Sequence, residues 1–278
     1  NSQYPMFIAI TQNLVNILVS LILVYVFEMK IEGVAIGTLV AQYAGYLIAI
    51  ALWMHRYKHL RPFAELRSLT DKKAMQRFFQ VNRDIFLRTL CLVSVTVFFT
   101  SAGAAQGEII LAVNTLLMQL FTLFSYIMDG FAYAGEALTG KHIGANNQPS
   151  LRAMISQLFL WGIGLALAFT LLYGIGGAKF LGLLTNEENV ITASSTYFYW
   201  ILAIPLAGFA AFLYDGIFIG ATATGLMLRA MFVASVAFFL IYFGCRDMMG
   251  NHALWLAFII YLALRGIVQG FLGRKILN

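Results

Sequence analysis

Residues 153–178 read AMISQLFLWGIGLALAFTLLYGIGGA, a run without a single Asp, Glu, Lys or Arg. A helix that crosses the roughly 30 Å hydrocarbon layer of a membrane needs about 20 mostly apolar residues. In lipid the backbone must satisfy its own hydrogen bonds, and a helix does so within one segment. The stretch therefore predicts a transmembrane helix.

The same pattern recurs along the chain and predicts an all-α polytopic membrane protein with about eight transmembrane helices. The runs fall near residues 6–27, 33–54, 85–105, 109–139, 153–178, 190–221, 226–244 and 251–273. The fourth and sixth runs exceed a simple span, and each contains an Asp-Gly pair, Asp129-Gly130 and Asp215-Gly216. Tilt, a bend or extension into the cytoplasm would accommodate this length.

The composition excludes several other classes of protein. Of 278 residues, 61% are hydrophobic and 11% are charged, whereas a soluble domain carries about 25% charged residues. So few charges cannot cover a water-exposed surface, which excludes a soluble enzyme and a disordered chain. Two cysteines, Cys91 and Cys245, allow one bridge at most and exclude a disulfide scaffold.

The distribution of basic residues predicts the orientation in the membrane. Eight of the eighteen Lys and Arg residues lie between Arg56 and Arg83, so this linker should be cytoplasmic under the positive-inside rule. Alternate counting places both ends of this chain inside, and the predicted external loops hold Lys30, Lys179 and Arg246. A basic linker between apolar runs does not indicate a nucleic-acid surface.

The linker also divides the chain into lobes. We expect two helices of one lobe in residues 1–55, an inter-lobe linker in residues 56–83 and a six-helix lobe in residues 84–278. Within the linker, Thr70 and Asp71 precede a stretch of mixed polarity from Lys72 to Gln80, which predicts a capped interfacial helix.

Ionisable groups at membrane depth are costly and indicate function by default. Asp129 and Asp215 are the main candidates, either as binding sites for a proton, a sodium ion or a cationic compound, or as partners of helix ends or an arginine. Asn114 could line a wet cavity, and Tyr126 and Tyr214 flank the two aspartates. These five residues are the predicted ion- or substrate-binding candidates.

Three other charged residues are interpreted as structural. Asp84 and Arg88 are spaced i, i+4, which places them on one helix face and predicts an ion pair near the cytoplasmic start of the third span. Arg265 lies deeper, in the last span, and is a candidate counter-ion for a distant carboxylate.

Enzymatic signals are weak throughout. The chain has no Walker lysine loop, no Gly-x-Ser-x-Gly elbow and no His-Glu-x-x-His motif, so we expect no catalytic residue and no cofactor. His55 and His59 have helical spacing but no acidic or cysteine ligand nearby, and we expect no metal site. Uphill transport would then depend on an ion gradient.

Four stretches of the sequence carry a resemblance to a known family. They are Leu111-Ala-Val-Asn114, Ser125-Tyr-Ile-Met-Asp129-Gly through Gly140-Lys-His-Ile-Gly144, Asn82-Arg83-Asp84 through Arg88, and Pro205 through Gly220. In these stretches the sequence resembles the multidrug and toxic compound extrusion (MATE) family, in particular its DNA-damage-inducible F branch, and the first two stretches are the most similar. The resemblance implies a twelve-helix, two-lobe bacterial inner-membrane transporter, with this chain matching family helices five to twelve.

The implied activity is secondary export of amphipathic organic cations by alternating access, in exchange for protons or sodium ions. Asp215 matches a cation-binding position on family helix ten, but Thr89 to Val93 hold no carboxylate at the helix-seven position, which favours protons. The expected partners are small amphipathic or cationic substrates and membrane lipids, without nucleic acid, and the full-length protein is expected to be monomeric. The alternatives are a flippase for lipid-linked oligosaccharides or lipids, and a non-transporting scaffold.

Overall fold

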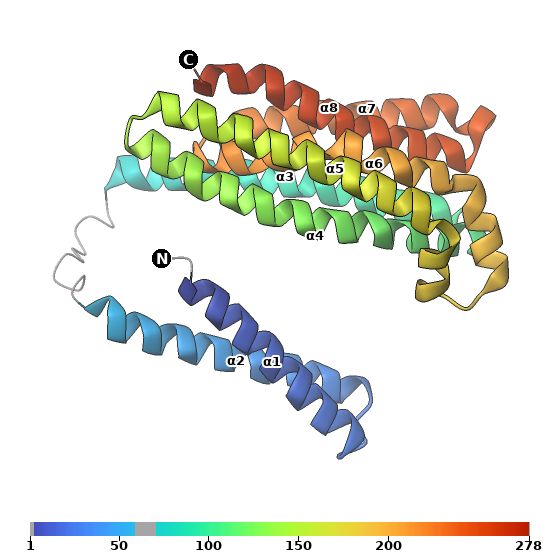
Figure 1. Cartoon of the computed structure of the whole chain (residues 1–278), viewed down its shortest axis with the longest axis horizontal. Helices are drawn as coiled ribbons and strands as arrows, with labels where there is room; N and C mark the ends of the chain where they lie inside the picture. Colours follow the sequence, from blue (N-terminus) through green and yellow to red (C-terminus); the bar gives the residue numbers. More distant parts are fainter. Residues whose placement is uncertain (1–2, 59–70, 278) are drawn as a thin grey trace. The chain divides into compact units, whose positions relative to one another are not determined.

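All regular secondary structure in the described residues is helical, as the apolar runs predict. The computed structural model describes residues 3–58 and 71–277, and within them eight helices are long and apolar enough to cross a membrane. Their bounds are α1 Gln3–Tyr25, α2 Ile31–Arg56, α3 Lys72–Ala104, α4 Glu108–Gly144, α5 Gln148–Leu184, α6 Glu188–Gly220, α7 Thr224–Met249 and α8 Asn251–Leu277. Figure 1 shows these helices in the order of the sequence.

The helices extend beyond the predicted runs where polar residues continue the helical conformation. α3 begins at Lys72 and runs unbroken through the predicted interfacial segment into the third span, which corrects the expectation of a separate helix. Lys, Arg, Gln and Met favour helix without being apolar, so an apolar run marks only part of α3. Asp71 caps it, since its Oδ1 accepts a hydrogen bond from the Lys73 amide at 3.0 Å. The predicted cap residue Thr70 lies outside the described residues.

The chain divides into two compact units, residues 1–75 and residues 76–278. In the first unit, α1 and α2 pair as a helical hairpin. The small residues Gly33, Gly37, Ala41 and Gly45 recur every four positions on α2 and are its buried residues. A Cβ atom on Gly37 would lie 2.2 Å from the Ser20 hydroxyl oxygen, so the two helices approach closely at this position.

The second unit is a six-helix bundle centred on α6. This helix packs against α4, α5 and α8, and α7 packs against α8. A Cβ atom on Gly216 would lie 2.0 Å from the Ala132 carbonyl oxygen, and one on Gly220 would lie 2.3 Å from that of Glu136. The backbones of α4 and α6 therefore touch, and this contact fixes the position of Asp215 beside Gly216.

Helix α3 joins the bundle through long side chains rather than through close backbone contact. Near its end, Phe99 meets Trp255 and Phe258 of α8 with ring centroids 5.0 and 5.3 Å apart. Phe98 meets four aromatic rings of α7 edge to face, those of Phe238, Phe239, Tyr242 and Phe243. The spaces left beside α3 hold both hollows considered below.

Candidate functional site

The most heavily bonded polar group in the described core is the carboxylate of Asp215 on α6. Arg88 of α3 and Arg265 of α8 both form ion pairs with its Oδ2 atom. The Gln269 side-chain amide of α8 donates a hydrogen bond to its Oδ1 atom at 2.6 Å. Asp215 therefore joins three helices that are far apart in the sequence.

Local geometry explains how α8 supplies two of these three partners. Arg265 and Gln269 are four residues apart, so they point from one face of the helix. The Arg265 guanidinium also lies over the Phe212 ring, 5.4 Å from its centroid, which adds a cation–π contact inside the bundle. Phe212 precedes Asp215 by one turn of α6, so both α6 contacts to Arg265 come from the same side of that helix.

The charges of this cluster do not cancel. Two guanidinium groups meet one carboxylate, which leaves one positive charge in excess by formal count. The Nε atoms of Arg88 and Arg265 and the Oε1 atom of Gln269 are buried without a hydrogen-bond partner among the described residues. Because buried unpaired charge is costly, removal of the Asp215 carboxylate would leave both guanidinium groups buried without their ion-pair partner.

A cavity of about 230 Å³ lies against this cluster. Its wall combines charge with four aromatic rings, and the lining residues are Arg88, Leu92, Thr96, Phe121, Ser125, Asp129, Phe212, Asp215, Phe258, Tyr261, Leu262 and Arg265. Asp129 of α4 is half-buried in this wall, and no hydrogen bond or ion pair involves it within the described residues. Its carboxylate is thus the available acid of the cavity, and Asp215 is the engaged one.

The structure brings two of the five predicted candidates together. Asp129 and Asp215 both line the cavity, whereas Asn114 is buried elsewhere in the bundle. The Asn114 and Asn251 amides exchange hydrogen bonds at 2.8 and 2.9 Å, and the Trp255 indole donates to Asn114 Oδ1 at 2.9 Å. This network occupies the Asn114 amide in joining α4 to α8.

The two candidate tyrosines also lie outside the cavity wall. Tyr126 is 72% exposed and borders a different hollow, between α4 and α5. Tyr214 is half-buried beside Phe159, with ring centroids 4.8 Å apart, and faces Gly270 of α8. Neighbours in the sequence point in different directions on a helix, so proximity to Asp129 or Asp215 in the chain did not place them in the site.

The expected pairing of Asp84 with Arg88 is wrong. Asp84 accepts from Arg83 at 3.2 Å and from the Thr224 hydroxyl at 3.3 Å, while Arg88 turns to Asp215. The spacing permits a local pair, but both carboxylates are buried, and Asp84 bonds to Arg83 and Thr224 while the Arg88 side chain reaches Asp215 on α6. Arg265 does act as a counter-ion for a distant carboxylate, and that carboxylate is Asp215.

Sequence reasoning missed Gln269, Thr96 and Tyr261 as parts of this site. For Gln269 a signal existed, because it stands one turn after Arg265 in a span that is otherwise mostly apolar. For the other two no signal separates them from polar residues elsewhere in the spans. Within the described residues, no cluster of three or more His, Cys, Asp or Glu side chains could hold a metal ion.

Comparison with known proteins assigns the chain to a family. The sequence model of the MatE family matches residues 85–243, more than half of the chain. The chain belongs to the MatE family. DNA damage-inducible protein F of Escherichia coli K12 is 36% identical over 276 residues, which cover 98% of this chain and 59% of that protein. Protein DETOXIFICATION 42 of Arabidopsis thaliana is 23% identical, over 95% of this chain and 50% of that protein.

A solved structure of the Vibrio cholerae MATE transporter VcmN in its bent form has the same fold. It superimposes with a TM-score of 0.82 at 15% identity, over 100% of this chain and 63% of that one. The predicted all-α membrane fold and the predicted family are both confirmed. The chain is thus a multi-pass membrane protein of a transporter family. It spans about half to three fifths of the length of the curated relatives it matches.

Proposed function

We propose that this chain forms part of a secondary transporter that exports amphipathic organic cations in exchange for protons, with Asp129 as the carboxylate that binds one or the other. The observation that carries the proposal is the unpaired Asp129 carboxylate in a cavity walled by Phe121, Phe212, Phe258 and Tyr261. Aromatic faces attract flat organic cations, and a carboxylate among them supplies the charge.

The cycle uses two protonation states of one group. Ionised Asp129 attracts a cationic compound from the inner side, and protonation from outside removes that attraction and favours release. Such a cycle drives export only if the inward-open and outward-open states differ in proton affinity. A proton that binds both states equally well would not shift the equilibrium between them. A proton suits this cavity better than a sodium ion, since a single free carboxylate is enough to bind a proton, whereas among the described residues no cluster of three or more His, Cys, Asp or Glu side chains could hold a metal ion.

In this proposal Asp215 positions the site rather than binding the cation. Its carboxylate already forms ion pairs with two guanidinium groups, and its negative charge offsets part of their repulsion of a cationic substrate. Loss of that carboxylate would expose the substrate to two uncompensated positive groups. Asp215→Asn should therefore impair export even though Asp215 does not contact the substrate.

The proposal also covers the membrane in which the protein resides and its oligomeric state. The identity to a protein of Escherichia coli supports a bacterial plasma membrane, and the cavity is built within a single chain, which supports a monomer. Lipids surround the many exposed apolar side chains of the spans. The relatives are longer, so the other part of the transporter would complete the substrate path.

A second candidate function is favoured by one observation. If Asp129 is protonated, the cavity holds an excess of positive charge from Arg88 and Arg265, which suits a phosphate head group. A flippase for lipid-linked oligosaccharides or lipids would use that charge. The two functions differ in the sign of the transported molecule.

The test is ethidium efflux from vesicles that contain the intact protein, with an imposed proton gradient and separately with an imposed sodium gradient. We expect efflux with the proton gradient and at least tenfold slower efflux for Asp129→Asn. Asp247→Asn, which alters an exposed aspartate near the end of α7 and outside the cavity wall, should export at the original rate. Efflux driven by sodium alone would refute proton coupling, and anionic lipid translocation without ethidium efflux would establish the flippase.

A further inference from the structure

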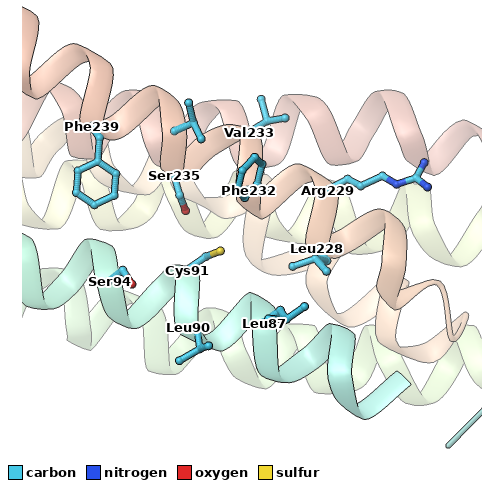
Figure 2. Close-up of a pocket in the computed structure, with 11 residues that line it drawn as sticks. Leu87, Leu90, Cys91, Ser94, Leu228, Arg229, Phe232, Val233, Ser235 and Phe239 are labelled. Atoms are coloured by element: carbon cyan, nitrogen blue, oxygen red, sulfur yellow. The ribbon is translucent and has the colours of Figure 1, made fainter. Parts of the chain in front are cut away.

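A second hollow, larger than the charged cavity, lies between α3 and α7. Its volume is about 770 Å³, and its wall is almost wholly apolar. The lining residues are Leu87, Leu90, Cys91 and Ser94 of α3 and Leu228, Arg229, Phe232, Val233, Ser235, Val236 and Phe239 of α7. Figure 2 shows the two helices facing each other across this groove, with the apolar side chains along it.

Both ends of the groove are closed by contacts between the two helices. At one end the Thr224 hydroxyl donates a hydrogen bond to Asp84 Oδ2 at 3.3 Å. At the other end the Phe98 ring packs edge to face on Phe239 and Tyr242, with centroids 5.1 and 5.2 Å away. Between these contacts the helices stay apart, so the groove is a bounded feature of the bundle.

The dimensions of the groove match one hydrocarbon chain of one leaflet. From Leu228 to Phe239 the lining follows α7 for about 17 Å at 1.5 Å per residue. Half of the roughly 30 Å hydrocarbon core is about 15 Å. An acyl chain that enters sideways from the bilayer, with its head group near Leu228, would therefore lie against apolar side chains over its whole length.

A positive charge lies at the Leu228 end of the groove and favours a lipid with an anionic head group. Arg229 is the one charged residue of the lining, and Figure 2 shows its guanidinium extended away from the apolar part. No hydrogen bond or ion pair in the described chain engages it. Arg77 of α3 donates to the Thr222 hydroxyl at 3.2 Å, in the turn that precedes α7, and adds a second positive group nearby. The positive-inside rule predicts that this end is cytoplasmic.

We propose that the groove between α3 and α7 binds an anionic glycerophospholipid of the inner leaflet, with one acyl chain in the groove and the phosphate near Arg229. The guanidinium of Arg229 pairs well with phosphate oxygens and repels the cationic compounds that the charged cavity attracts. The occupant is thus a lipid rather than a substrate. This site does not depend on the proposed export activity, because neither Asp129 nor Asp215 lines it.

The experiment is native mass spectrometry of the intact purified protein with added phosphatidylglycerol or phosphatidylcholine that carry identical acyl chains. We expect phosphatidylglycerol to bind more tightly, and Arg229→Gln to weaken its binding about fivefold, the effect of one basic group near an anionic phosphate. Arg274→Gln is the matched control. It removes an exposed arginine from the last turns of α8, at the same end of the bundle, outside the groove.

A second variant tests the groove itself. Leu90→Trp places a larger side chain in the groove without altering charge, and it should reduce binding of phosphatidylglycerol while Arg229 remains. The melting temperature of each variant shows whether it has folded. Equal binding of both lipids, equal losses in Arg229→Gln and Arg274→Gln, or full binding by folded Leu90→Trp would each overturn the proposal.

Discussion

The charged cavity and the apolar groove lie on opposite sides of α3 and differ in volume and in polarity. The cavity side presents Arg88, Leu92 and Thr96, one helical turn apart, to charged and aromatic groups of α4, α6 and α8. The groove side presents Leu87 and Leu90 to apolar residues of α7. Both ion pairs of Asp215 border the smaller hollow, and no ion pair among the described residues borders the larger one.

The difference teaches how a helix is held in a bundle inside lipid. Lipid tails are as apolar as leucine, so burial of apolar surface alone does not drive helices together there. α3 is attached through the charge cluster and the Phe99 contacts with α8 on one side, and through contacts at the two ends of the groove on the other. Among the described residues of the second unit, no side chain fills the middle of the groove, and this is where the proposed lipid chain lies.

The largest expected effect tests the cavity side. Asp215→Asn leaves Arg88 and Arg265 buried without their carboxylate, and breaking a buried ion pair in this way costs about 3 to 5 kcal/mol of the free energy of unfolding. We expect a loss of this size by denaturant titration in detergent micelles. Asp247→Asn removes an exposed pair with Arg246 and should change the free energy by less than about 1 kcal/mol. Similar losses in the two variants would mean that the cluster does not hold α3.

A smaller effect is expected at the aromatic end of the groove. Phe98→Ala removes four edge-to-face contacts with α7, and aromatic pairs contribute about 0.5 to 1.5 kcal/mol each. Because these contacts share one ring, we expect a total loss of about 2 kcal/mol, measured by the same titration. Phe86→Ala, at a position of α3 that is 62% exposed, is the control and should cost much less. A negligible loss for Phe98→Ala would show that α3 and α7 are not joined there.

The smallest effect is expected in the middle of the groove. Leu90 is 46% exposed and faces the hollow, so Leu90→Ala should lower the free energy of unfolding by about 0.5 kcal/mol or less. Leu92→Ala, on the cavity side and packed against the core, should cost about 2 kcal/mol. If the two leucines cost the same, the contrast between the two sides of α3 is lost.

The fold could be read from the sequence because membrane spans leave a strong local signal. Eight apolar runs gave eight helices, and the helices continue through both Asp-Gly pairs without a break. The cap at Asp71 predicted a helix start at Lys72, but the residues from Lys72 to Arg83 are of mixed polarity, so no apolar run showed that this helix continues into the third span. The predicted lobe boundaries at residues 55 and 83 stay a prediction.

The site was only partly accessible from the sequence, because pairing between distant helices leaves no local trace. Asp129 and Asp215 share the same pattern, an acid followed by glycine after an apolar run. Nothing in that pattern shows that one is held by two arginines and the other is unpaired. The nearby Asp84 gave Arg88 a plausible local partner, and only the position of α6 beside α3 reveals the actual one.

The order in which a ribosome makes this chain adds a constraint to the cluster around Asp215. Arg88 is synthesised 127 residues before Asp215, and Arg265 follows Asp215 by 50 residues. During insertion, α3 therefore enters the bilayer with an arginine whose counter-charge does not yet exist, at a cost of about 2.5 to 3.5 kcal/mol at the centre of a span. Arg88 lies close to the polar first part of α3, so its side chain can reach the membrane–water interface until Asp215 has been inserted. The bonds around Asp215 are thus complete only after α8, which carries Arg265 and Gln269, has been inserted.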